Sequence, residues 1–144
     1  MLAGHLALVA AAIFFGVAFY VGFAEQAARL SLDDRALLAE WKPAYKRGYA
    51  IQAPLAIIGF ILGIVACWQT GRLAFLAGSL SMIANWPWTI FAIMPTNSVL
   101  MATSLDDANA RTRELIVRWN LLHSVRTILG GVATVAFLIA LSAA

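Results

Sequence analysis

Four long apolar runs, separated by shorter polar segments, dominate the pattern of this chain. Residues 3–24, 48–69 and 73–94 contain no Asp, Glu, Lys or Arg, and residues 115–142 contain only Arg118 and Arg126. A helix rises about 1.5 Å per residue, so each run is long enough to cross a hydrocarbon layer about 30 Å thick. The pattern predicts an all-α fold in which the four runs are transmembrane helices of one domain, residues 1–144.

The connections between the runs predict how the helices are threaded. Thr70, Gly71 and Arg72 are typical of a tight turn, so we expect the second and third helices to form an antiparallel hairpin. Residues 26–42 link the first two helices, and residues 95–104 link the last two. Asp33 and Asp34 are typical capping residues, which predicts a short amphipathic helix over residues 35–41 at the membrane interface. The expected architecture is an antiparallel up-down bundle with both termini on the same side.

Composition and charge place the bundle in a membrane and predict its orientation. The chain is 62% hydrophobic and 12% charged, whereas soluble domains average about 45–50% and about 25%. Every Lys and Arg except Arg72 lies in the first connection, in the third connection or in the helix turns beside them, which predicts that this side faces the cytoplasm and that the termini lie outside. We expect a multi-pass protein of a bacterial-type inner membrane. The lipid bilayer is therefore the expected partner, and nucleic acid is not.

Polar side chains gather at the helix ends that this threading brings to one side of the bundle. Such groups are costly inside a bilayer, so they face the bundle interior and often mark a function. His123 and Arg126 lie on one face of the fourth helix, and a buried arginine needs a carboxylate or a ligand, for which Glu25 is the natural partner. Glu25 and Arg29 are spaced i,i+4, which favours a structural ion pair. Gln52, Asn85 and Thr89 also fit simple interhelical hydrogen bonds, just as Gly59 and Gly63 fit a helix contact.

Several kinds of site are excluded by the residues present. The chain has no nucleophile elbow, phosphate-binding loop or zinc-binding HExxH motif, and its single cysteine, Cys67, lies in an apolar run. His5 and His123 are expected on opposite sides of the membrane, so haem ligation by both within one chain is not expected. One histidine beside one glutamate is also a poor transition-metal site. No metal is therefore predicted.

Four strings of the sequence resemble a known family. These are FAEQAARL, EWKPAYKRGYAIQAPLA, NWPWTIFAIMPTN and RWNLLHSVRTILG, with Met94 to Asn97 and the pattern Trp119, His123, Arg126 as the most specific pieces. They resemble the anthrone oxygenase-like family of small four-helix membrane proteins, over nearly the whole chain, residues 16–135. The resemblance implies an oxidoreductase that converts an anthrone into an anthraquinone, in a pocket at the cytoplasmic side of the bundle.

The implied chemistry assigns roles to particular residues. An anthrone carries an acidic methylene group whose anion reacts directly with dioxygen, so neither a metal nor a flavin is needed and no cofactor is expected. The reaction needs an apolar pocket, a base, and a cation or donor that stabilises the anion. On this hypothesis His123 is the base and Arg126 stabilises the anion. The expected substrate-binding residues are Tyr49, Gln52, Asn85, Trp86, Thr89, Asn97 and Trp119.

A second hypothesis treats the chain as a non-enzymatic membrane protein, either an accessory subunit or a protein that binds a lipid or a quinone. It rests on the lack of a complete catalytic motif and on the Gly59 and Gly63 face, which suits a homo-oligomer or a larger membrane complex. This hypothesis predicts that Glu25, His123 and Arg126 form a closed network with no cavity behind it. The presence or absence of that cavity separates the two interpretations.

Overall fold

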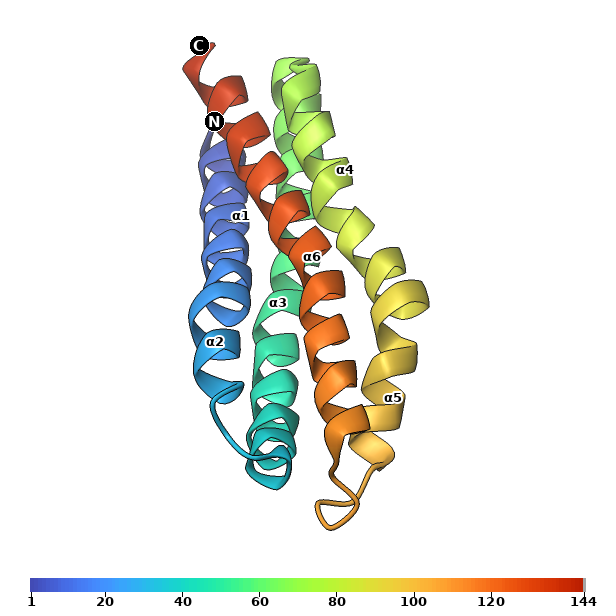
Figure 1. The fold of residues 1–144 in the computed structure, drawn as a ribbon. Helices are drawn as coiled ribbons and strands as arrows, with labels where there is room; N and C mark the ends of the chain where they lie inside the picture. Colours follow the sequence, from blue (N-terminus) through green and yellow to red (C-terminus); the bar gives the residue numbers. More distant parts are fainter. Residues whose placement is uncertain (144) are drawn as a thin grey trace.

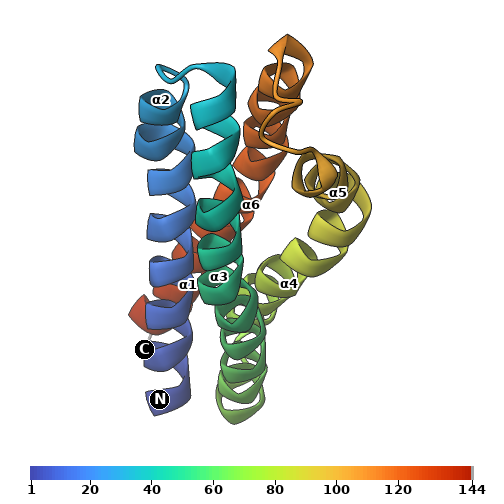
Figure 2. The same cartoon turned by 90° about the horizontal axis from the view of Figure 1, so that it is seen from below.

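The computed structural model describes residues 1–143, which form a bundle of long helices in an antiparallel arrangement (Figure 1). The first helical run comprises α1 (Leu2–Tyr20), the π-helical segment η1 (Val21–Glu25) and α2 (Gln26–Arg29), and it is followed by α3 (Asp34–Thr70). The second half comprises α4 (Leu73–Trp88), the π-helical segment η2 (Thr89–Ile93), α5 (Met94–Ala102) and α6 (Ala110–Ser142). The helices pack in a ring in which α1 and α4 each contact both α3 and α6, with α1 and α3 side by side (Figure 2). The predicted all-α bundle is confirmed.

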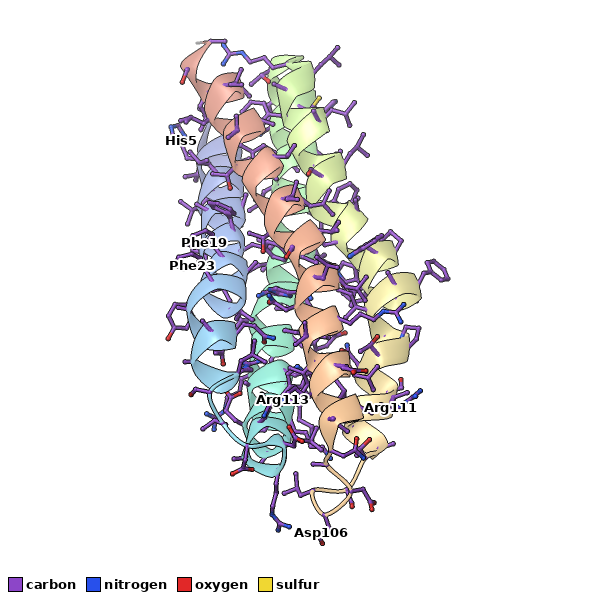
Figure 3. All side chains as sticks on the ribbon, viewed as in Figure 1. His5, Phe19, Phe23, Asp106, Arg111 and Arg113 are labelled. Atoms are coloured by element: carbon purple, nitrogen blue, oxygen red, sulfur yellow. The ribbon has the colours of Figure 1, made fainter. Side chains whose placement is uncertain are left out.

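Four helical runs are long and apolar enough to cross a membrane, so contact with a lipid bilayer follows. They are Leu2–Arg29, Asp34–Thr70, Leu73–Ala102 and Ala110–Ser142. Met1 and the last turns of α6 lie at one end of the bundle, and the two longer connections lie at the other (Figure 1). His5 lies toward the first end, whereas Asp106 and Arg113 lie at the second (Figure 3).

Two of the expected connections are wrong because the helices continue through them. Residues 35–41 form the first turns of α3 rather than a separate interfacial helix, and Leu37, Leu38 and Trp41 are fully buried there. Residues 95–102 are helical as α5, with Pro95 in its first turn, where a missing backbone donor is tolerated. Lys42 Nζ donates to the carbonyl oxygens of Met101 and Thr103, at 3.2 and 2.5 Å. These hydrogen bonds supply donors for carbonyl groups at the C-terminal end of α5. Tertiary packing therefore extends both helices beyond their uncharged runs.

The remaining turns have identifiable local causes. Gly71 adopts φ +69° and its N–H donates to the Cys67 carbonyl 2.7 Å away, which ends α3 and makes the predicted hairpin turn. Asn109 caps α6 through a reciprocal capping box with Thr112. Arg113 donates to the carbonyl oxygen of Leu30 at 3.0 Å, and its Nε lies 2.6 Å from Asp34 Oδ1. These contacts fasten the α2–α3 connection to α6.

The interior contains two apolar cores. The core nearer the termini consists mainly of alanines packed around a few large side chains, including Phe14, Phe75, Met82 and Phe137. Close helix approach is visible at Gly63, where an added Cβ would lie 2.1 Å from Ser79 Oγ. The second core, nearer the long connections, is built from Leu37, Leu38, Trp41, Ile93, Leu100, Ile116 and Trp119.

Candidate functional site

A layer of buried polar side chains lies between the two apolar cores. On α3 it occurs between Trp41 and Ala56, and on α6 it occurs between Trp119 and Ala133. In the third helical run, Leu73–Ala102, the polar layer comprises the end of α4 and the start of η2. Its buried members include Gln52, Asn85, Thr89, His123 and Arg126. The antiparallel threading therefore brings candidate residues from three helices to a common level.

The geometry at His123 assigns a tautomer to its ring. The side chain is 3% exposed, and its Nε2 lies 3.2 Å from the carbonyl oxygen of Ala18 on α1. A carbonyl oxygen only accepts hydrogen bonds, so Nε2 must carry the proton. In the neutral ring Nδ1 is then the basic nitrogen, and it has no hydrogen-bond partner within residues 1–143. Trp119 stacks on the ring, with centroids 4.9 Å apart and an interplanar angle of 15°.

Arg126 is a buried cation that contacts an aromatic ring instead of a carboxylate. Its residue is 7% exposed, and its guanidinium carbon lies 5.5 Å from the centroid of the Phe14 ring. In the part of the chain described, its Nε lacks a hydrogen-bond partner and no ion pair includes it. The expected pairing of Arg126 with Glu25 is therefore wrong, since Glu25 binds a different arginine. A buried charge without a partner is costly, so this position suits an anionic ligand atom.

Glu25 belongs to an ion-pair cluster around Arg29. Glu25 Oε1 lies 2.8 Å from Arg29 Nη2, and Glu40 Oε2 lies 2.8 Å from Arg29 Nε. The Arg29 side chain is 2% exposed, whereas those of Glu25 and Glu40 are 25% and 36% exposed. Helical spacing does not predict Glu40 as a partner, because Glu40 lies in α3 whereas Arg29 ends α2. The turn between α2 and α3 brings the two side chains together.

A small cavity of about 20 Å³ adjoins His123. We call it the His123 cavity; it lies between η1, α3 and α6. Gln52 lines it and is 1% exposed, with its Oε1 unpartnered among the described residues. The other lining residues that carry polar or aromatic groups are Glu25, Arg29, Tyr45, Tyr49, Trp119, His123 and Arg126.

A second small cavity, of about 20 Å³, lies between α3, the end of α4 and η2. We call it the Asn85 cavity. Asn85 Nδ2 donates to the carbonyl oxygens of Ser81 and Met82, which leaves its Oδ1 without a partner in the residues described. Trp86 lines the cavity and donates from Nε1 to the Ala53 carbonyl at 3.3 Å. Tyr49 and Arg126 border both cavities, as the residues common to the two linings.

Aromatic rings form one continuous wall beside the His123 cavity. Trp41 meets Trp119 edge to face at 5.7 Å, and Trp41 stacks on Tyr45 at 5.0 Å. Tyr45 in turn contacts Tyr49, with ring centroids 6.4 Å apart. Trp41 is fully buried in the second core, because α3 begins seven residues before it. Flat, rigid walls of this kind suit a planar ring system.

The two cavities account for most of the residues expected to bind a substrate. Tyr49, Gln52 and Trp119 line the His123 cavity, and Tyr49, Asn85, Trp86 and Thr89 line the Asn85 cavity. Asn97 lines neither of these two cavities; it is buried in α5 with both side-chain polar atoms unpartnered within residues 1–143.

Sequence reasoning did not anticipate the two π-helical segments at the level of the site. Val21 and Glu25 of η1 line one cavity, and Thr89 and Ile90 of η2 line the other. Such segments often occur at functional sites, because the wider turn alters the direction of the side chains. Pro87, just before η2, was the only sequence signal for either. Among residues 1–143 no group of three His, Cys, Asp or Glu side chains is placed to hold a metal ion.

Comparison with known proteins gives a consistent result. A family profile described as "Anthrone oxygenase" matches residues 41–136, which include every lining residue contributed by α3, α4, η2, α5 and α6. A curated anthrone oxygenase from Claviceps purpurea is 30% identical over 106 residues, covering 65% of this chain. The matched region spans 60% of the length of that relative. No solved structure matches the chain.

Proposed function

Because the chain belongs to the anthrone oxygenase family, we propose that it oxidises the methylene carbon of an anthrone to a carbonyl group, using dioxygen. One observation carries the proposal: His123, with an unpartnered basic nitrogen, and Arg126, with no carboxylate, border the same aromatic-walled cavity. The relative from Claviceps purpurea bears the name of this activity. The substrate class is a flat, tricyclic hydroxylated ketone. Such a molecule is larger than the cavity of about 20 Å³, so the lining side chains must move apart to admit it.

The first step is removal of a methylene proton by His123. Its Nδ1 takes the proton, while the hydrogen bond from Nε2 to the Ala18 carbonyl holds the ring in this tautomer. Negative charge then develops on the ketone oxygen across the ring system. Arg126 stabilises that oxyanion, and its own burial is compensated by the charge that forms. The phenolic O–H groups donate to Asn85 Oδ1 and Gln52 Oε1, which need donors.

Dioxygen then reacts with the carbanion. A new carbon–oxygen bond forms, and the resulting peroxide takes the proton held by His123. The hydroperoxide next loses its remaining C–H proton as the O–O bond breaks, which leaves a carbonyl group and a molecule of water. One dioxygen is therefore reduced, with one of its oxygen atoms retained in the quinone and the other released in water. We propose further that the site lies toward the cytoplasmic face, on the basis of the Lys and Arg distribution.

The test is turnover of 1,8-dihydroxyanthrone by the purified chain in lipid nanodiscs. Dioxygen uptake and anthraquinone absorbance are recorded together, after subtraction of spontaneous oxidation. In His123→Gln the amide nitrogen replaces Nε2 as donor to Ala18, but no basic nitrogen remains, so we expect a loss of about 10²-fold or more. His5→Gln is the matched control, since His5 is exposed at the other end of the bundle. A folded His123→Gln variant with the wild-type rate would overturn the proposal.

The same experiment tests the non-enzymatic alternative. That hypothesis expects a closed network of Glu25, His123 and Arg126, whereas Glu25 pairs with Arg29 and a cavity lies among the three. Saturable binding of the anthrone, without dioxygen uptake above the spontaneous rate, would favour a binding protein over an oxygenase. Binding and turnover are therefore measured on the same preparation.

A further inference from the structure

A groove on the outside of the bundle adjoins the His123 cavity. It runs between the end of α1 with η1 and the first half of α3, and has a volume of about 450 Å³. Val21, Glu25, Ala44 and Gly48 line both the groove and the His123 cavity. The groove and the cavity therefore share a wall to which these four residues contribute. We call this space the η1–α3 groove.

Gly48 is the boundary residue whose size matters most. A Cβ added at Gly48 would meet no atom within 4 Å, so the space beside its backbone is open. The glycines of the packed core behave differently, since a Cβ at Gly59 would lie 2.8 Å from Met82 Cε. Gly48 is also not needed for an unusual backbone angle, because Gly71 is the one residue with positive φ among those described.

Neither packing nor backbone conformation therefore accounts for a glycine at position 48. A glycine inside a helix is less stabilising than alanine, and at position 48 no closer helix contact offsets that loss. Gly48 lines both the groove and the cavity, so its missing side chain leaves open space at their shared wall. The cavity behind that wall is lined by residues with unpartnered polar atoms among those described, including Gln52, His123 and Arg126.

We propose that the η1–α3 groove is the entrance to the His123 cavity, and that Gly48 determines how wide an aromatic molecule can pass. The occupant is the flat tricyclic substrate class of the proposed function, on which this inference rests. Its ring edge slides past the backbone of Gly48 and then reaches Gln52, one helical turn further along α3. The entrance admits molecules from the side of the bundle, between two helices that are apolar enough to span a membrane.

The test measures entry independently of turnover. 1,8-Dihydroxyanthraquinone, which is already oxidised, is mixed rapidly with the protein in nanodiscs, and its association rate is followed by quenching of tryptophan fluorescence. Gly48→Leu places a branched side chain in this space, so we expect the rate to fall by about tenfold or more, within the roughly one to three decades over which association rates vary among variants of one binding surface. A two-ring hydroxynaphthoquinone should be slowed much less. Gly16→Leu is the matched control, because Gly16 is also helical and open but borders neither space.

A second variant covers the case in which Gly48→Leu fails to fold. Gly48→Cys in a Cys67→Ala background is purified folded and then modified with a bulky methanethiosulfonate reagent. Modification should slow anthraquinone association, reduction should restore the rate, and bound anthraquinone should protect the thiol. An unchanged rate after complete modification would overturn the inference.

The competing route runs past Ile90, which lines the Asn85 cavity and is 47% exposed. If Ile90→Trp slows anthraquinone association more than blocking position 48 does, the entrance lies there and the inference is wrong. Absence of anthraquinone binding by the wild-type protein would overturn it as well. If binding depends on position 48 but no anthrone is turned over, the entrance stands and only the proposed reaction fails.

Discussion

Replacing Arg126 with methionine should stabilise the protein while abolishing its activity. Arg126 is 7% exposed and has no carboxylate partner within residues 1–143, and burial of an ion costs several kcal/mol. The cation–π contact with Phe14, at 5.5 Å, offsets up to about 2 kcal/mol of this cost when the cation is desolvated. Methionine has a similar length and needs no partner, so we expect a net gain of about 1–3 kcal/mol, as in other replacements of buried charges by apolar residues.

The gain is measurable as a shift of the thermal unfolding midpoint in detergent micelles. For a chain of this size about 1 kcal/mol corresponds to about 2–4 °C, so Arg126→Met should unfold several degrees above the wild type. Arg118→Met is the control, because Arg118 lies on the exposed face of the same helix, where substitutions change stability by about 0.5 kcal/mol or less. Turnover of 1,8-dihydroxyanthrone should fall to the spontaneous rate in Arg126→Met only.

A lower midpoint for Arg126→Met than for the wild type would refute this reasoning, because it would mean that the guanidinium has a stabilising partner. Ligand binding gives an independent check. A bound quinone at a hundred times its Kd stabilises a protein by about 2.7 kcal/mol, and this stabilisation should be much smaller in Arg126→Met if Arg126 contacts the ligand oxygen.

Three further predictions concern stability, each checked by thermal or denaturant unfolding in micelles. Gly63→Ala should destabilise the bundle by about 1–3 kcal/mol, because its Cβ would lie 2.1 Å from Ser79 Oγ; Gly16→Ala, with open space around it, should not, and equal effects would contradict the packing argument. Asn109→Ala removes the capping box of α6 and should cost about 1 kcal/mol, whereas Asn109→Ser should restore most of it. Gly71→Ala forces a side chain into a left-handed turn with φ +69° and should cost about 1 kcal/mol; no change would show that the turn relaxes.

Local properties of the sequence were sufficient to predict the four apolar helical runs and their order, but not how far the helices extend beyond those runs. The uncharged runs are long enough to be helices in lipid, Gly71 allows the left-handed turn that ends α3, and the antiparallel order follows from the short hairpin. The level of the site was also predictable, because polar residues at the end of one helix and the start of the next must meet when the helices alternate in direction. His123 and Arg126 share a face of α6 through their spacing alone.

The pairing of these groups was decided by tertiary structure. By sequence, Glu25 could form an ion pair with either Arg29 or Arg126. Which pair forms depends on how α1 is rotated about its axis and shifted along it relative to α6, and the spacing of residues within one helix does not determine either. Packing between helices also decides that Glu40 contacts Arg29, that residues 35–41 continue α3 against the second core, and that the π-helical segments form. The cavities are likewise the spaces that remain after all the side chains have packed. Sequence thus defines which groups are available within each helix, and only packing between helices determines which of them remain without a partner.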